Sequence, residues 1–280
     1  MRESDPMPLD WKPVAKAGAV CVMLLILCGF GGGLWHRRCN VTIGPAQSVI
    51  NHDSTQECIN PGLVTLPDGH LLAAFYCIGK ASIVTQLSKD RGATWGHGIA
   101  VDTGMKPSTV SLSLLHDGKL FLSTSLTPAS GKSIPAYLIG TIGAGDEITW
   151  GAPVLVDTPE SIEGCAAVSP VVYLRNGDLL WPVWCFHSNK QHLPGISTVL
   201  ISTDGGVTWP RQVTVAGGAR DGRDFDESAA VVYPNGDVVM MMRQTTGCNG
   251  TDYCGAYWRS QSTEGATHGR LRWRRLIISM

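Results

Sequence analysis

The sequence has almost no net charge and few charged residues. Its 22 Lys and Arg residues nearly balance its 23 Asp and Glu residues, which leaves a formal net charge of −1. Charged residues make up only 16% of the chain. A protein that binds nucleic acid usually carries a basic patch that neutralises phosphates. We therefore expect no nucleic-acid partner.

The sequence also lacks the short motifs that hold phosphates, dinucleotides or metals. It contains no phosphate-binding loop, no Rossmann glycine fingerprint and no G-x-S-x-G nucleophile elbow. The spacings of its nine cysteines fit no zinc pattern. His187 and His192 are close in sequence, but no acidic or cysteine partner lies at ligand spacing. These absences predict a protein without an organic cofactor or a metal ion.

Only one hydrophobic run is long enough to cross a membrane. Residues 17–35 are uncharged, and their number is close to the roughly 20 that a transmembrane helix needs. A cleaved signal peptide and a buried soluble helix are the alternatives, although three consecutive glycines weaken a soluble helix. More Lys and Arg residues precede the run than follow it, so residues 1–16 are expected in the cytosol. We therefore expect a single-pass membrane protein whose stem, residues 36–47, and remaining chain face the secretory lumen or the outside.

Two further features agree with that side of the membrane. The sequons that begin at Asn40 and Asn249 are acceptors for N-glycosylation. Cys248 and Cys254 could close a small disulfide loop in an oxidising compartment, or they could remain free thiols. Because the cysteine count is odd, at least one cysteine is unpaired within the chain.

The rest of the sequence repeats with a period of 55 to 59 residues. Trp95, Trp150 and Trp209 each follow a threonine, and His268 continues the series. Upstream of each lies an apolar run broken by an Asp-Gly or Asn-Gly pair, which strongly predicts a β-hairpin turn. These pairs are Asp68-Gly69, Asp117-Gly118, Asn176-Gly177 and Asn235-Gly236.

A unit of this length, built from about four short strands, is typical of one β-propeller blade. The alternative is a β-sandwich in which the regularity is accidental. The sequence therefore predicts an all-β protein with about four blades after residue 47. The predicted blades are residues 48–105, 106–160, 161–220 and 221–275.

Two of the tryptophans belong to a stricter motif. Residues 88–95 and 202–209 both fit S-x-D-x-G-x-T-W at every position. In such a turn the Asp can accept hydrogen bonds from nearby backbone N–H groups, the Gly allows positive φ, and the Trp buries a large surface. We therefore interpret these residues as structural rather than catalytic.

This motif is the Asp box, and the chain resembles the sialidase (neuraminidase) superfamily of Asp-box proteins. The resemblance implies a β-propeller of the six-bladed sialidase type, and with about four blades present the chain is expected to be truncated. Asp boxes also occur in propellers that are not enzymes. The motif therefore implies the fold better than it implies the chemistry.

A segment of the fourth repeat resembles the sialidase active site. The chain from Asp226-Glu227 to Arg243 is similar to the family pattern N-E-x-x-V-V-E-L-x-D-G-x-L-x-x-x-x-R and keeps its Glu-to-Arg spacing. The resemblance implies that Glu227 is catalytic, by polarising a nucleophilic tyrosine, and that Arg243 binds the sialic-acid carboxylate. A three-residue turn at 234–236 is expected to pair Glu227 with Arg243 on one face of the hairpin. A purely structural cross-strand ion pair is the alternative.

The same resemblance predicts groups that this sequence does not contain. The family's first carboxylate-binding Arg lies two residues before a proline, and Ile59 holds that position before Pro61. Residues 76–82, where the acid/base Asp is expected, contain no acid. Two functions are therefore expected. One is an exo-alpha-sialidase-like glycoside hydrolase that removes terminal sialic acid from glycoconjugates; the other is an inactive Asp-box propeller that binds glycans or proteins. The expected partners are sialylated glycans or glycoproteins.

Overall fold

A computed structural model describes most of the chain beyond residue 56. The described residues are 57–78, 81–129, 131–157, 162–187, 195–218, 223–244, 257–262 and 273–278. The predicted membrane helix, the stem, and the pair Cys248 and Cys254 lie outside them. Among the described residues, no helix is long and apolar enough to span a bilayer. The chain divides into Met1–Gln47 and Ser48–Met280, and all that follows concerns the second unit.

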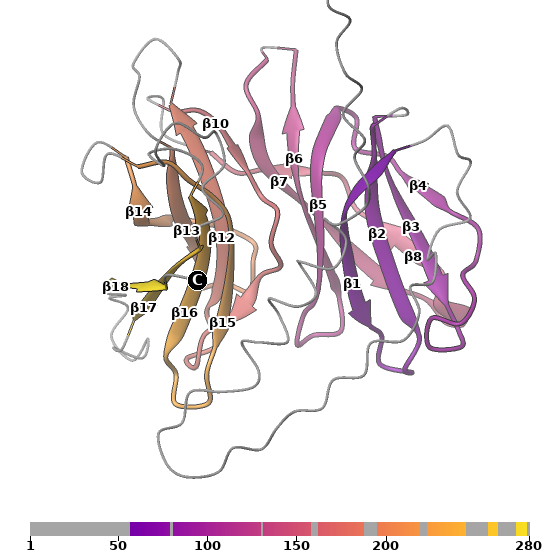
Figure 1. Ribbon diagram of the computed structural model, residues 1–280. Coiled ribbons are helices and arrows are strands. Elements are labelled where there is room, and N and C mark those ends of the chain that lie inside the picture. The colour runs from indigo at the N-terminus through magenta and orange to yellow at the C-terminus, as the bar shows by residue number, and fades with distance from the viewer. Residues whose placement is uncertain are drawn as a thin grey trace, which may run out of the picture. The chain divides into compact units, whose positions relative to one another are not determined.

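The described chain forms four consecutive antiparallel sheets (Figure 1). The first sheet contains β1 (Cys58–Thr65), β2 (Leu71–Cys77), β3 (Ser82–Ser88) and β4 (Ile99–Val101). The second contains β5 (Lys106–Leu114), β6 (Leu120–Thr127), β7 (Ile134–Ile142), β8 (Ile148–Trp150) and β9 (Val154–Leu155), with a 3₁₀ turn, η2 (Ala144–Asp146), before β8. The third contains β10 (Ile162–Ala166), β11 (Val172–Tyr173), β12 (Leu179–His187), β13 (Ile196–Ser202) and β14 (Arg211–Gly217). The fourth contains β15 (Phe225–Val232), β16 (Val238–Gln244), β17 (Tyr257–Ser262) and β18 (Trp273–Ile278).

Each sheet contains the hairpin turn that its Asp-Gly or Asn-Gly pair predicts. Between β15 and β16, the N–H of Tyr233 donates to the carbonyl of Asp237, and the N–H of Gly236 donates to the carbonyl of Tyr233, each over 2.8 Å. Gly236 has a φ of +91°, which favours glycine because it has no Cβ. The other three turns share this hydrogen-bond pattern. The four predicted hairpins are therefore confirmed.

The sheets bury alternate residues of one strand against different neighbours. In β6, Leu120 and Leu122 pack against residues of the first sheet, whereas Phe121 packs against residues of the third. In β12, Trp181 faces the second sheet and Leu180 faces the fourth. Side chains alternate between the two faces of a strand, so a sheet covered on both faces needs apolar residues at successive positions. This explains why residues 120–122 of β6 and residues 179–181 of β12 are apolar at successive positions.

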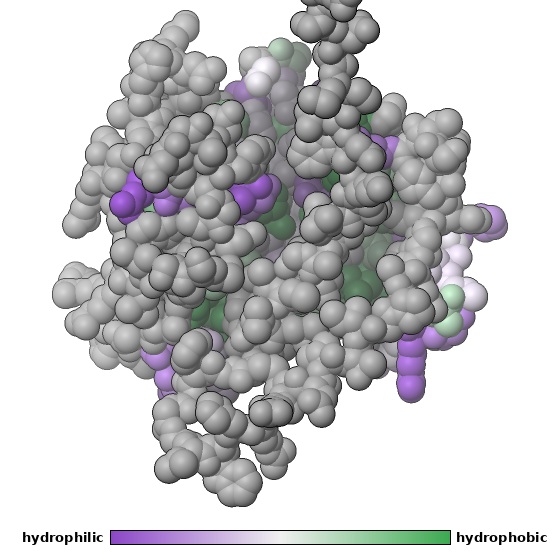
Figure 2. All heavy atoms as spheres, in the orientation of Figure 1, coloured by the Kyte–Doolittle hydropathy of each residue, from purple (hydrophilic) through white to green (hydrophobic). Residues whose placement is uncertain are grey.

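The outer surface is more hydrophilic than the interior. On the face shown in Figure 2, the most hydrophobic described atoms lie in recessed places, and some of the most hydrophilic ones project at the edge. A few large apolar side chains are nevertheless exposed, including Leu63 on β1 and Ile99 on β4. Single exposed apolar residues are ordinary on protein surfaces.

The first strand of every sheet is bulged near its start, where its pairing with the next long strand shifts. A bulge adds an unpaired residue and redirects the side chains around it. The shifts lie between Ile59 and Gly62, Pro107 and Thr109, Ile162 and Gly164, and Asp226 and Ala229. No pattern in the sequence predicted these bulges.

The two Asp boxes form the structural turns expected of them. In the second box, the Asp204 carboxylate accepts hydrogen bonds from the Ser202 hydroxyl and from the backbone N–H and hydroxyl of Thr208. The N–H of Gly206 donates to the Ser202 hydroxyl over 2.8 Å, and Gly206 has a φ of +94°. Asp90 makes the same contacts in the first box. The interpretation of these residues as structural is supported by this network.

The Asp-box carboxylates predict how stability depends on pH. Hydrogen bonds from Thr208, and then from Ser202, lower the pKa of Asp204 from 3.8 to about 2 despite an opposing effect of burial. A lowered pKa in the folded state stabilises the fold above the unfolded value, and this contribution disappears as pH falls towards about 2. We expect Asp204→Asn to lower the melting temperature at neutral pH, and the difference from wild type to shrink between pH about 4 and about 2.

Thermal melts from pH about 7 down to about 2 would test this expectation. Asp157→Asn is the matched control, because it removes the same charge at an exposed position outside both boxes. A difference between wild type and Asp204→Asn that stayed constant over the whole range would contradict the assignment.

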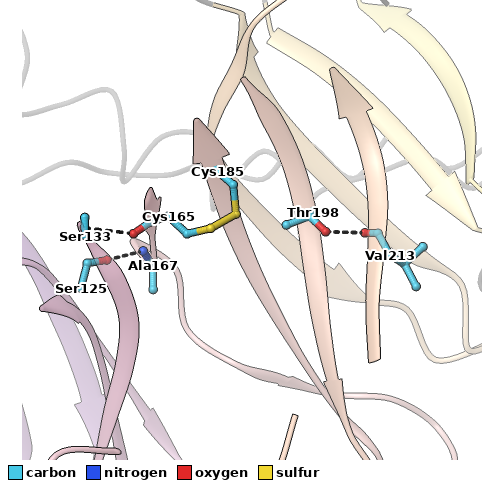
Figure 3. The surroundings of a disulfide bond; sticks show 7 residues. All are labelled: Ser125, Ser133, Cys165, Ala167, Cys185, Thr198 and Val213. Carbon is cyan, nitrogen blue, oxygen red and sulfur yellow. Dashed lines mark hydrogen bonds between the residues drawn. A yellow bond between two sulfur atoms is a disulfide. The ribbon is translucent and has the colours of Figure 1, made fainter. Parts of the chain in front are cut away.

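In each of two sheets, a disulfide links the first strand to the next long strand. Cys58 pairs with Cys77 across β1 and β2, and Cys165 pairs with Cys185 across β10 and β12. Figure 3 shows that the second disulfide lies beside hydrogen bonds from the second sheet. There the Ser125 hydroxyl accepts from the N–H of Ala167 over 2.9 Å, and the Ser133 hydroxyl donates to the carbonyl of Cys165 over 3.1 Å. Neither disulfide was predicted from the sequence.

Candidate functional site

Three charged side chains meet at the bulge of β15. Both Nε and Nη2 of Arg243 donate to the Asp226 carboxylate, to Oδ1 over 2.9 Å and to Oδ2 over 2.8 Å. Nη2 also lies 3.1 Å from Oε1 of Glu227. The structure thus brings together both predicted site residues, Glu227 and Arg243, and adds Asp226.

The predicted cross-strand pairing of Glu227 with Arg243 is wrong. The register expected from the turn holds from Val232 to Ala229, and the bulge then shifts it by one residue. Asp226 is therefore the partner of Arg243 in the ladder, while Glu227 lies within the bulge. The bulge is a local departure from regular pairing, so counting outward from the turn could not detect it.

The three side chains differ in exposure and in electrostatic setting. The Glu227 side chain is 50% exposed, that of Arg243 27% and that of Asp226 11%. The partial burial of its carboxylate raises the pKa of Glu227; Arg243 opposes this rise and Asp226 adds to it. A carboxyl group with a raised pKa can exchange a proton nearer to neutral pH. Glu227 is thus the accessible acid–base group of the cluster.

Contacts from the third sheet hold the start of β15 in place. The Ser169 hydroxyl donates to the carbonyl of Ser228, and both serines are buried. The N–H of Gly195 donates to the Asp224 carboxylate. Phe225, which is almost wholly buried, packs in the apolar cluster between the third and fourth sheets. These contacts fix the chain on both sides of Asp226 and Glu227.

The backbone of Glu227 is strained, but strain alone does not indicate chemistry here. Glu227 has a φ of +32°, a value that non-glycine residues rarely adopt and that often marks a functional site. Asn60, at the equivalent place in the bulge of β1, has a φ of +53°. Because the feature recurs in another sheet, it belongs to the bulge. Only the side chains of Glu227 and its neighbours therefore indicate a function.

The position that the resemblance assigns to another arginine is apolar. Ile59 is half-buried and pairs with Tyr76 immediately before the bulge of β1. It thus occupies in β1 the place that Asp226 occupies in β15. The first sheet therefore presents a hydrophobic side chain where the fourth presents a carboxylate.

A second charged cluster, which the sequence did not reveal, joins the first two sheets. Nδ1 of His70 lies 2.7 Å from the Asp68 carboxylate and 2.8 Å from the Asp146 carboxylate. One nitrogen or oxygen atom from each of the three side chains, of the kind that can bind a metal ion, lies within 4.8 Å of the other two. Burial tends to raise the pKa of Asp146, but hydrogen bonds with Asp68, His70 and Lys89 lower it overall. Nζ of Lys89 lies 3.3 Å from this carboxylate and supplies a positive charge. We therefore interpret the cluster as a structural ion-pair network that holds the first two sheets together.

The sequence could not indicate this cluster because His70 and Asp146 are 76 residues apart and share no motif.

A groove of about 410 Å³ is found elsewhere, where β3 and β5 begin and β4 ends. Its lining includes Asp102 and Lys106 but neither Glu227 nor Arg243. The groove is thus separate from the charged cluster on β15 and β16.

The sequence matches no protein-family profile, and no curated protein is detectably similar to it in sequence. Solved structures do match. A protein of unknown function from Dyadobacter fermentans is 19% identical over 79% of this chain and 69% of its own, with a TM-score of 0.63. A Hadza microbial sialidase is 16% identical over 78% of this chain and 46% of its own, with a TM-score of 0.57. An alpha-L-arabinanase from Penicillium chrysogenum is 16% identical over 79% of this chain and 67% of its own, with a TM-score of 0.58.

These matches concern the fold, since all three identities lie below 20%. This chain spans about half the length of the Hadza sialidase, 46%. The sialidases and arabinanases that match are β-propeller glycoside hydrolases. The repeats, the Asp boxes and the four packed sheets agree with that architecture. The chain therefore shares the β-propeller fold of these solved structures.

Proposed function

We propose that this protein is a glycoside hydrolase of the exo-alpha-sialidase type that acts at Glu227 and Arg243. The observation that carries the proposal is the 3.1 Å contact between these two side chains at the bulge of β15. A solved structure of similar fold is named a sialidase, which supports the choice of substrate class. The substrate would be a terminal sialic acid on a glycan or glycoprotein.

The chemistry of the two side chains suits that reaction. A guanidinium group presents parallel donors that match a carboxylate, and sialic acid carries one. Sialidases use a tyrosine nucleophile, and a neighbouring carboxylate can accept its proton. Glu227 is half exposed and has a raised pKa, so it can exchange a proton with a group in the site. Arg243 would orient the sugar, and Glu227 would accept the proton of the tyrosine nucleophile.

We also propose that the propeller lies in the secretory lumen or outside the cell, anchored by residues 17–35. The two disulfides support this location because such bonds persist in oxidising compartments and are rare in the cytosol. Treatment of cell-derived protein with an N-glycosidase tests the location. We expect a loss of mass that is smaller in the Asn249→Gln variant and disappears when Asn40→Gln is added. An unglycosylated protein in the cytosolic fraction would contradict the proposed location.

A second candidate is a propeller of the same fold that binds glycans or proteins without catalysis. Ile59 favours it, because an isoleucine cannot bind the carboxylate of a sugar. The solved arabinanase of similar fold is complexed with arabinobiose, a sugar without a carboxylate, which shows that the fold accepts ligands of that kind.

Turnover of a fluorogenic sialoside by the full chain tests the first candidate against the second. We expect Glu227→Gln to lower kcat by about 100-fold or more, since general acid–base groups contribute about that much. Glu147→Gln is the matched control, because it makes the same change in the second sheet, away from the site. Sialoside binding without turnover in the wild type would favour the binding propeller. Unchanged turnover in Glu227→Gln would show that the site is assigned wrongly.

A further inference from the structure

We propose that Asp226 determines the charge specificity of the site by occupying the edge of Arg243 that a substrate carboxylate would use. The inference rests on the proposed function, because it concerns the same Arg243. The inference goes beyond the proposed function because it assigns a role to Asp226, a residue to which the resemblance gives none. Asp226 acts as a resident carboxylate that an acidic sugar must displace.

The contact geometry shows which edge is occupied. Nε and Nη2 of Arg243 form one side of the guanidinium fork, and each donates to a different oxygen of Asp226, over 2.9 and 2.8 Å. This two-point arrangement is the one by which arginine binds carboxylates in general. A sugar carboxylate that approaches the same edge meets donors that are already engaged.

The backbone makes Asp226 a persistent competitor. Asp226 pairs directly with Arg243 in the β15–β16 ladder, and its side chain is only 11% exposed. A group tethered opposite its partner acts at a high effective concentration, without the entropy cost that a free ligand pays. A free acidic sugar therefore competes at a disadvantage for the same donors.

The charge of the cluster acts in the same direction. Asp226 and Glu227 carry two negative charges when ionised, and Arg243 carries one positive charge, so the three side chains sum to −1. A sugar carboxylate adds another negative charge a few ångströms away, which is unfavourable where solvent is partly excluded. A neutral sugar that donates hydroxyl hydrogens to the carboxylates meets no such repulsion.

The sequence difference that creates this state is a single group. The sialidase pattern has asparagine before its glutamate, whereas this chain has Asp226 before Glu227. An asparagine at this place carries no charge and offers one oxygen in place of two. Asp226→Asn should therefore free donors of Arg243 while keeping nearly the same shape.

The opposite role for Asp226 makes a different prediction. If Asp226 only oriented Arg243 for a ligand, its loss would weaken the binding of an acidic sugar. If Asp226 competes with the ligand, its loss strengthens that binding. The sign of the change therefore separates the two roles.

The experiment measures the binding of N-acetylneuraminic acid and of its neutral methyl ester to the full chain by calorimetry. For the acid, we expect Asp226→Asn to lower Kd by about tenfold or more, the effect of a charge-assisted hydrogen bond. For the methyl ester, we expect almost no change. Adding Arg243→Gln to Asp226→Asn should abolish the gain.

Asp237→Asn is the matched control, because it removes one carboxylate from the turn of the same hairpin and should leave the acid's Kd unchanged. Circular dichroism and thermal melts establish that each variant is folded. An unchanged or raised Kd of folded Asp226→Asn for the acid would overturn the inference. So would an equal gain for the methyl ester, or a gain that survives Arg243→Gln.

Failure of this inference and failure of the proposed function give different results. If Glu227→Gln abolishes sialoside turnover while Asp226→Asn does not strengthen acid binding, the function holds and the inference fails. If Asp226→Asn strengthens acid binding while neither it nor the wild type cleaves a sialoside, the inference holds and the enzymatic proposal fails.

Discussion

Trp181→Ala is expected to lower the free energy of unfolding by about 3–5 kcal/mol, the usual range for removing a buried tryptophan. Trp181 is fully buried between the second and third sheets. Its ring centroid lies 5.2 Å from that of Trp209 and 5.4 Å from that of Phe121, and Phe121 approaches it edge to face. Truncation leaves a cavity with rigid aromatic walls, and such walls collapse poorly into the vacated space.

Denaturant unfolding followed by circular dichroism measures this loss. Trp184→Ala is the matched control, because Trp184 belongs to the same strand but is only half-buried, with Phe186 as its aromatic neighbour at 5.4 Å. We expect a clearly smaller loss for the control. Equal losses for the two variants would mean that the aromatic cluster is not the main contact between these sheets.

This cluster also shows why an Asp-box tryptophan is structural. Trp209 ends the second Asp box, and its ring packs within 5.8 Å of Phe121 and 6.4 Å of Tyr137. The hydroxyl of Tyr137 donates to the carbonyl of Val207 within the same box. The turn of the third sheet is thereby fixed to β6 and β7 of the second. The second box thus joins a local turn to the packing between neighbouring sheets.

Features whose causes are local could be predicted from the sequence. The hairpin at Asn235-Gly236 needs a positive φ at position 236, and the glycine there permits it. The Asp204 network involves residues no more than four positions apart. Short-range hydrogen bonding of this kind leaves a clear pattern in the sequence, and both predictions are confirmed.

Features that depend on neighbouring sheets could not be predicted. The bulge at Glu227 is stabilised by the bond from Ser169 to Ser228, whose partners are 59 residues apart. Its consequence is that Asp226, and not Glu227, faces Arg243 in the ladder. The resemblance indicated that Glu227 and Arg243 would meet. It could not indicate that a third side chain would occupy the donors of Arg243.

Removing the disulfide between Cys165 and Cys185 is expected to lower the free energy of unfolding by about 3 kcal/mol or more. The bond links residues 20 positions apart, and loops of this size lose about 3 kcal/mol of chain entropy in the unfolded state. Both cysteines are also buried in the same cluster as Trp181. The double variant Cys165→Ala/Cys185→Ala therefore loses both a covalent constraint and packing.

The chain supplies its own comparison for separating these two effects. The disulfide between Cys58 and Cys77 spans 19 positions, so its entropic contribution is nearly the same. Cys58 is only half-buried, however, whereas Cys165 and Cys185 are almost wholly buried. Urea unfolding should therefore show a larger loss for the Cys165/Cys185 double variant than for the Cys58/Cys77 double variant. The opposite order would mean that packing around Cys165 contributes little, and that the hydrogen bonds from Ser125 and Ser133 are sufficient to hold β10 against the second sheet.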